Sequence, residues 1–170
     1  MTGHVSLRRA LDLVTSQAIL DAIRLNATML LASGNPSPRI AVAALNPHAG
    51  AGGLFGTEEI EIIAPAVEAA RAELGLDITG PWPADSVYRQ AFDGAFDGVV
   101  AMYHDQGQIA SKLRGFNRGI TVTAGLPVVF TTPAHGTAYD ITGTGKAQTG
   151  ALAAALDLAA RLATLANRPD

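Results

Sequence analysis

The feature that most constrains the fold is a repeated order of short apolar runs, loops and helical segments. Residues 39–45 (RIAVAAL) and 97–103 (DGVVAMY) are short apolar runs of the kind that form buried strands. A loop follows each run, and a helical segment follows each loop. This order predicts an α/β fold, in which a sheet carries helices on both faces. Chemistry in such folds gathers in the loops after the carboxyl ends of the strands.

The rest of the chain continues the same alternation, with apolar residues at helical spacing near both ends. Helices are predicted over 6–33, 57–74 and about 149–166. Ser6 is the expected cap of the first helix, which has a second start at Thr15 or Ser16. Pro65 should break or restart the second helix. Further strands are predicted within 119–125 and 126–132, and loops or extended segments at 46–56, 77–86 and 135–147. No linker or internal repeat interrupts the pattern, so we expect a single α/β domain over residues 1–170.

Composition and charge exclude several classes of function. The 170 residues are 48% apolar and 16% charged with a net charge of −3, so the chain has a core but no basic surface for nucleic acid. The absence of cysteine excludes disulfides and thiolate metal sites, which leaves His, Asp and Glu as possible metal ligands. The first residues lack a signal peptide, and no apolar run is long enough to span a bilayer. We therefore expect a cytoplasmic protein.

All four histidines, His4, His48, His104 and His135, lie beside glycine or in loops and strand ends. Neutral imidazole is the usual nitrogen ligand of divalent ions, and three histidines with one open position form a catalytic metal site. No HxH or HExxH spacing is present, so ordinary surface histidines are the alternative interpretation.

Two loops carry several glycines. NPHAGAGG follows a strand and precedes a helix, so its amides could cradle a phosphate or nucleotide, although it matches neither a P-loop nor GxGxxG. HGTAYDITGTG places Asp140 where a carboxylate could accept ribose hydroxyls of an adenosine. The alternatives are a flexible turn for the first loop and a capped loop for the second.

Two further polar residues are candidates for the site. Lys112 follows His104 by eight residues on a predicted helix, so its ammonium could lean toward the same loop. Asp85 is either a helix cap or a site carboxylate. A solvated surface lysine is the alternative for Lys112.

Taken together, four motifs in this order resemble the 4-hydroxythreonine-4-phosphate dehydrogenase (PdxA) family: LNPHAGAGGLFGTEEI, GPWPADS, AMYHDQG followed by a lysine, and GLPVVFTTPAHGTAYDITGTGKA. The resemblance covers nearly the whole chain and implies the isocitrate/isopropylmalate dehydrogenase-like fold. HGTAYDITGTG also resembles the adenosine-binding loop of those related dehydrogenases, which implies that Gly136, Thr137 and Asp140 bind the cofactor.

The resemblance further implies a metal-dependent, NAD- or NADP-linked oxidoreductase that works as a homodimer with a shared active site, in pyridoxine biosynthesis. The family's metal histidines fall on His4, His48 and His104, and His104 is the one supplied by the partner subunit. Its substrate lysine falls on Lys112 and its site aspartate on Asp85, so these are the expected catalytic residues. The expected reaction oxidises a secondary alcohol of a small acidic substrate such as 4-phosphooxy-L-threonine, with zinc, magnesium or a similar divalent ion and with possible coupled decarboxylation.

Three departures from the family leave alternatives open. The family's N-terminal region, which supplies a His-Thr pair to the substrate, has no counterpart before His4. Thr121 and Phe130 replace the family's substrate-binding asparagine and arginine, and phenylalanine cannot pair with a phosphate as arginine does. The alternatives are a dehydrogenase for an aromatic dihydrodiol dicarboxylate of the terephthalate type, and a truncated, non-catalytic module for cofactor binding or dimerisation.

Overall fold

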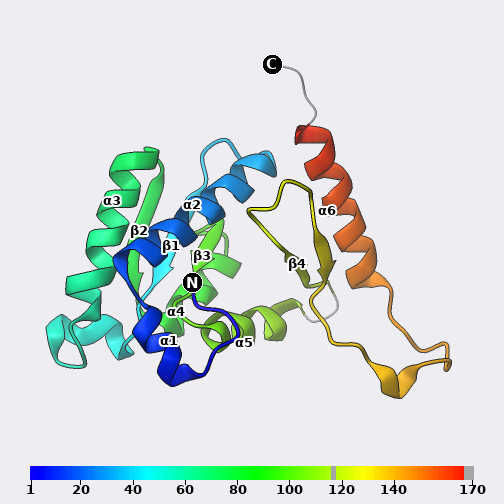
Figure 1. The fold of residues 1–170 in the computed structure, drawn as a ribbon, viewed down its shortest axis with the longest axis horizontal. Helices are drawn as coiled ribbons and strands as arrows, with labels where there is room; N and C mark the ends of the chain where they lie inside the picture. Colours follow the sequence, from blue (N-terminus) through cyan, green and yellow to red (C-terminus); the bar gives the residue numbers. More distant parts are fainter. Residues whose placement is uncertain (116–117, 167–170) are drawn as a thin grey trace. The chain divides into compact units, whose positions relative to one another are not determined.

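The computed structural model of the protein describes residues 1–115 and 118–166 and contains two compact units (Figure 1). The first unit comprises Met1–Gln108 and the second comprises Ile109–Asp170. The boundary falls within helix α5 (His104–Gly115). Since two compact units can belong to one domain, this division does not test the expectation of a single domain over residues 1–170.

The first unit is built on a parallel three-stranded sheet with strand order β2-β1-β3. The strands are β1 (Arg39–Ala43), β2 (Asp77–Trp82) and β3 (Gly98–Val100). Ile40 in the central strand pairs with Ile78 on one side and with Gly98 on the other. The two predicted apolar runs therefore form neighbouring strands, and the loops after their carboxyl ends lie at the same edge of the sheet.

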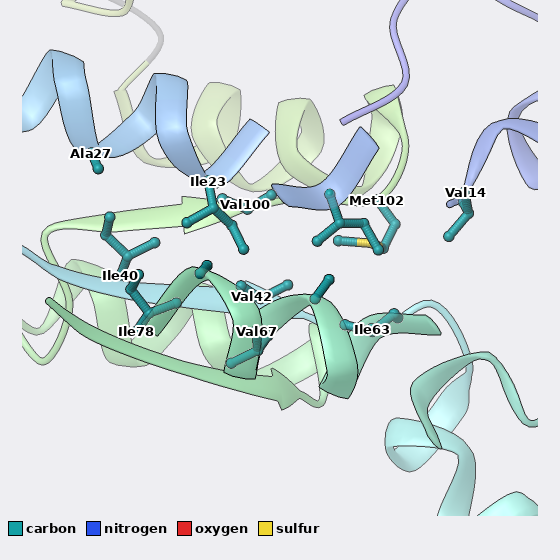
Figure 2. Packing of buried hydrophobic residues seen from close by; sticks show 13 residues of the cluster. Val14, Ile23, Ala27, Ile40, Val42, Ile63, Val67, Ile78, Val100 and Met102 are labelled. Atoms are coloured by element: carbon teal, nitrogen blue, oxygen red, sulfur yellow. The ribbon is translucent and has the colours of Figure 1, made fainter. Parts of the chain in front are cut away.

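Helices cover both faces of this sheet. One face carries the apolar core, in which side chains of β1–β3 pack against α2 (Ser16–Ala32) and α3 (Ala64–Leu74) (Figure 2). On the other face, Ala41 and Ala43 pack against Val87 of α4 (Ala84–Phe92). The chain moves from β1 to β2 and then back past β1 to β3. Because parallel crossovers are right-handed, this reversal places α3 and α4 on opposite faces.

Hydroxyl caps divide the first predicted helix into two. The Ser6 hydroxyl accepts a hydrogen bond from Arg9 N (3.3 Å) at the start of α1 (Leu7–Leu13), and the Thr15 hydroxyl accepts one from Ala18 N (3.2 Å) at the start of α2. Thr15 and Ser16 were the two residues predicted to start the second helix, and Thr15 is the one that caps it. Pro65 likewise lies in the first turn of α3, after the π-helical turn η2 (Glu59–Ile63), so the predicted restart is confirmed.

Strand β2 lies in the segment 77–86, which was predicted to be extended and rich in turns, so its extended backbone agrees with the prediction. The proline and glycine within β2 are tolerated because β2 is an edge strand, where a missing N–H is acceptable. The register shifts between Ala41 and Ala43, where Gly80 approaches so closely that a Cβ there would lie 2.5 Å from Val42 O. Only glycine fits this bulge.

The second unit contains a small antiparallel pair of strands and a long helix. Strands β4 (Ile120–Val122) and β5 (Thr131–Pro133) pair directly, and α6 (Gly150–Ala166) packs against them. The Thr131 hydroxyl donates a hydrogen bond to Ala155 O (2.9 Å) and joins β5 to α6. The strand predicted over 126–132 is thus confirmed only at its end.

Among the described helices, none is both long and apolar enough to cross a membrane, and the predicted cytoplasmic location stays a prediction.

Candidate active site

His4 and His104 lie side by side at the end of β3. The centroids of their rings are 5.0 Å apart, with the ring planes tilted by 45°. Residues 101–103 leave β3, and His104 is the first residue of α5. The N-terminal segment is fixed beside them, because Thr2 N and the Thr2 hydroxyl both donate to Met102 O (3.1 and 3.0 Å). Thr2 is buried, so these bonds hold His4 close to His104 although 99 intervening positions separate them in sequence.

The two histidines line a pocket of about 230 Å³. Thr2, Tyr103 and Asp105 also line it. The Asp105 carboxylate lies 2.7 Å from His104 Nδ1, so it fixes the orientation of that ring and leaves Nε2 for another partner. Imidazole nitrogens with a neighbouring carboxylate form a donor set that suits a divalent transition metal ion.

Gln106 has a structural role in the HDQG motif, residues 104–107. Its Oε1 accepts a hydrogen bond from Met102 N (2.7 Å), and its Nε2 donates to Ala44 O (2.8 Å). One side chain thereby joins the ends of β1 and β3, the two strands from which His48 and His104 are reached. The histidine of this motif was predicted from the sequence as a site residue, whereas the role of its glutamine was not.

The glycine-rich loop after β1 has an unusual left-handed backbone. In η1 (Pro47–Gly53), φ is positive at His48 (53°), Ala49 (52°), Gly50 (75°), Ala51 (45°) and Gly52 (69°). Each non-glycine residue in this conformation costs on the order of 1–2 kcal/mol. A run with three such residues persists only where other contacts hold it, so the flexible turn considered from the sequence is not what this loop forms.

A buried carboxylate holds this loop. Glu59 is 3% exposed, and its Oε1 accepts hydrogen bonds from Leu45 N (2.8 Å) and Asn46 N (2.7 Å). Its Oε2 accepts a third from Asn46 Nδ2 (2.9 Å). Burial alone would raise the pKa of Glu59, but these hydrogen bonds outweigh it and lower that pKa below its ordinary value. Glu59 is therefore ionised at neutral pH.

This role of Glu59 was not predicted from the sequence, which indicated only a helix over 57–74. The available signal was spacing, because Glu59 precedes the buried Ile63 by four residues and so shares its inward face. At the start of this segment, the Thr57 carbonyl oxygen accepts hydrogen bonds from Ile60 N (2.9 Å) and Glu61 N (2.8 Å).

The structure does not bring the third predicted metal ligand to the other two. His48 is exposed and lies against Phe55 of its own loop, with ring centroids 6.1 Å apart. Within residues 1–115 and 118–166, no three His, Cys, Asp or Glu side chains form a group that could hold a metal ion. The two histidines that do meet in one chain are His4 and His104, whereas the family resemblance pairs His4 with His48. The ligand set and its division between subunits stay predictions.

The two predicted catalytic residues are both exposed. Asp85 lies in the first turn of α4, whose N-cap position is Pro83, so the cap interpretation of Asp85 is wrong. A carboxylate in a first helical turn is still favoured by the helix dipole. Lys112 lies on α5, the helix that begins at His104.

In the second unit, the predicted cofactor loop surrounds a larger pocket. It has a volume of about 660 Å³, and Gly136 and Thr137 line it with Thr142 and Lys146. Asp140 lies on the short η3 helix (Tyr139–Ile141), and its side chain is exposed rather than part of the pocket wall. His135 also lines the pocket, and its Nδ1 is 2.9 Å from Gly136 O.

This fold and these motifs identify the chain as a member of the PdxA family. The family pattern, described as pyridoxal phosphate biosynthetic protein PdxA, matches residues 1–159. The 4-hydroxythreonine-4-phosphate dehydrogenase of Beijerinckia indica is 55% identical over 95% of the chain and 48% of its own length. The D-threonate 4-phosphate dehydrogenase of Pectobacterium atrosepticum is 50% identical over 96% of the chain and 50% of its own length.

Solved structures agree with this assignment. The 4-hydroxythreonine-4-phosphate dehydrogenase of Klebsiella pneumoniae superposes with a TM-score of 0.82 at 51% identity, covering 94% of this chain and 48% of that one. A terephthalate 1,2-cis-dihydrodiol dehydrogenase of Burkholderia xenovorans superposes with a TM-score of 0.74 at 34% identity, over 93% and 50% of the two chains. The isocitrate/isopropylmalate dehydrogenase-like fold predicted from the sequence is confirmed. The chain spans about half the length of the relatives that it matches.

Proposed function

We propose that this chain carries the metal- and nicotinamide-binding half of a dehydrogenase that oxidises a secondary alcohol of a small acidic substrate. The observation that carries the proposal is the pair His4 and His104, which share a pocket in a chain of this family. A divalent ion supplies Lewis acidity toward a substrate oxygen, and a nicotinamide accepts the hydride.

The chain's own residues have distinct roles in this proposal. His4 and His104 bind the ion, and Asp105 holds the ring of His104 in one orientation. Lys112 pairs with a carboxylate of the substrate, and Asp85 orients the substrate or accepts its proton. Gly136 and Thr137 border the pocket proposed for the cofactor. Asp140, whose exposed side chain lies outside the pocket wall, is proposed to accept the ribose hydroxyls.

The third ligand is proposed to be His48 of the partner subunit in a homodimer. His4 and His104 already meet within one chain, while His48 faces Phe55 instead. Three histidines can then surround one ion if a second copy of the chain contributes His48. This arrangement differs from the one implied by the resemblance, in which His104 comes from the partner.

Mixed dimers separate the two arrangements. Two differently tagged mutant chains are co-purified, and bound zinc is measured for each mixed dimer. If His4 and His104 act in one chain, a dimer of His4→Ala with His48→Ala keeps one intact site, and a dimer of His4→Ala with His104→Ala keeps none. The opposite pattern would assign His104 to the partner. Loss of zinc from both mixed dimers would contradict a shared site.

A turnover assay tests the reaction. The full chain is loaded with zinc or magnesium and incubated with NAD or NADP, with 4-phosphooxy-L-threonine, D-threonate 4-phosphate and a terephthalate dihydrodiol as substrates. Reduction of the nicotinamide with one of them supports the proposal. Cofactor binding without turnover would support the non-catalytic module instead.

Phe130 favours the dihydrodiol as a second candidate substrate. It is 49% exposed, next to the strand pair β4–β5, and offers an aromatic surface where the family is expected to use arginine for a phosphate. Thr121, the other replaced position, is exposed on β4. We expect Phe130→Arg to raise kcat/KM for a phosphorylated substrate and to lower it for the dihydrodiol. Equal changes for both substrates would remove Phe130 as a determinant of specificity.

A further inference from the structure

The loop that carries His48 is held from both sides by one acidic side chain. Glu59 accepts the backbone amides of Leu45 and Asn46, which lie at the entrance of the loop. The middle of the loop lies against the same carboxylate, because a Cβ at Gly50 would be 2.7 Å from Glu59 Oε2. The backbone before His48 is therefore hydrogen-bonded to this buried carboxylate, and the backbone after His48, at Gly50, packs against the same group.

A second contact closes the exit of the loop. Asn46 Nδ2 donates to Glu58 Oε2 (2.7 Å) as well as to Glu59 Oε2 (2.9 Å). Gly56 lies against this amide, since a Cβ there would be 2.6 Å from Asn46 Nδ2 and 2.5 Å from Glu58 Oε2. Residues 46–56 thus wrap around two carboxylates, of which Glu59 is the buried one.

This arrangement does not touch the imidazole itself. The recorded ring neighbour of His48 is Phe55, and Glu59 contacts only the loop that surrounds the histidine. A left-handed backbone at His48, with φ of 53°, sets the direction in which its side chain leaves the loop. Whatever keeps the backbone left-handed therefore also sets the direction of the imidazole.

We infer that Glu59 is a positioning residue for His48, which it keeps pre-aligned for a metal ion by fixing the left-handed loop. The inference rests on the proposed function, because it concerns the metal ligand that His48 provides there. Outer groups that fix a metal ligand typically contribute 10- to 100-fold to metal affinity. Glu59 acts in this way through the backbone rather than through a hydrogen bond to the ring.

The test is a set of double mutants with zinc alone as the probe. Zinc affinity of the full chain is measured by competition with a chromophoric chelator for Glu59→Ala, in the parent, His48→Ala and His4→Ala backgrounds. We expect Glu59→Ala to weaken zinc binding by about 10- to 100-fold in the parent and in His4→Ala. In His48→Ala we expect almost no further effect, because the ligand that Glu59 positions is already gone.

Glu59→Gln and Glu61→Gln serve as the conservative variant and the matched control. Glu59→Gln keeps one oxygen for the amides of Leu45 and Asn46, so it should recover most of the affinity and should fold even if Glu59→Ala does not. Glu61 lies in the same turn, η2, but is exposed, so Glu61→Gln should bind zinc like the parent. Amide hydrogen exchange at Leu45 and Asn46 without metal should rise in the order parent, Glu59→Gln, Glu59→Ala.

The outcomes distinguish the inference from the proposed function. An equal loss from Glu59→Ala in the His48→Ala and His4→Ala backgrounds would show a general structural role and would overturn the inference alone. If zinc binding is weaker in His48→Ala but unchanged in both Glu59 variants, the inference is likewise overturned while the proposed function stands. Unchanged binding in His48→Ala would remove the ligand assignment itself and the inference with it.

Discussion

The two glycine-rich loops of this chain are held in different ways. In the loop at 46–56, added Cβ atoms at Gly50 and Gly56 would lie 2.7 and 2.5 Å from glutamate oxygens. In the loop at 135–147, added Cβ atoms at Gly136, Gly143 and Gly145 would meet no described atom within 4 Å. The recorded side-chain hydrogen bonds there join near neighbours, such as the Thr144 hydroxyl to Ile141 O (2.7 Å).

The difference indicates two ways to prepare a binding loop. In the first loop, buried hydrogen bonds compensate the left-handed backbone. The second loop encloses a pocket of about 660 Å³ and has few contacts that would fix it in the absence of a ligand. A fixed direction would serve the metal ligand proposed at His48, whereas freedom to adjust would serve the cofactor loop proposed at 135–147.

The largest expected effect comes from a pair of glycine substitutions. Gly50 and Gly143 have the same φ of 75°, so alanine is equally strained at both positions. Gly143→Ala should cost about 1 kcal/mol, whereas Gly50→Ala should cost about 3 kcal/mol because its Cβ also meets Glu59. The measurement is the free energy of unfolding in urea. Equal costs would show that the two loops are held alike.

The next effect is the pH dependence of stability contributed by Glu59. Its pKa is lower in the folded protein than its ordinary value of 4.5, so its contribution is complete above that pH and is lost as the pH falls through the lowered pKa. At pH 7, Glu59→Gln should lower the free energy of unfolding by about 2 kcal/mol, as expected for a charged acceptor. The deficit should shrink below pH 4.5. A deficit that is constant between pH 7 and pH 3 would contradict the assignment.

A somewhat smaller effect is expected from cofactor binding to the second loop. At a cofactor concentration ten times Kd, amides that exchange by local opening should slow about tenfold. We expect this protection at residues 135–147 with NAD or NADP, and no such change at 46–56. Hydrogen exchange monitored by mass spectrometry measures both loops in one sample. Protection of the first loop instead would assign the cofactor to NPHAGAGG.

The smallest effect on stability is expected at Asp85. Its side chain is exposed in the first turn of α4, so Asp85→Asn should lower the free energy of unfolding by only about 0.5 kcal/mol. If Asp85 orients the substrate or accepts a proton, the same variant loses most of its turnover while retaining zinc binding. Thermal unfolding, zinc titration and the turnover assay together check this. Retained turnover would remove Asp85 from the site.

Local pattern was enough to predict most elements of the fold but not all of them. The apolar runs at 39–45 and 97–103 predicted β1 and β3, because a strand buried on both faces needs no partner to be recognised. Strand β2 was predicted only as an extended, turn-rich segment, because its proline and glycine are acceptable only at an edge, and an edge is defined by the other strands. Strand β5 was predicted too early, since its pairing with β4 begins only at Thr131.

The residues of the candidate site were also predicted only in part from the sequence. Motif order predicted the metal histidines and a cofactor loop, because these residue types follow strand ends or fill glycine-rich turns, and both assignments stay predictions. Thr2, Gln106 and Glu59 were missed, because each acts on a backbone group that is distant in sequence: Met102 O, Ala44 O and Leu45 N. The recorded pairing of His4 with His104, rather than with His48, also follows from these contacts.

The sequence by itself determined the α/β class, the family and the residue types available for chemistry, because hydrophobic spacing and short motifs are local properties of the chain. Only the tertiary structure decided which histidines meet and which carboxylate is buried. Hydrogen bonds such as those of Thr2 to Met102 and of Glu59 to Asn46 exist only after the sheet has brought distant backbone groups together. A buried acceptor must find such partners, and that requirement selects Glu59 over its neighbouring glutamates.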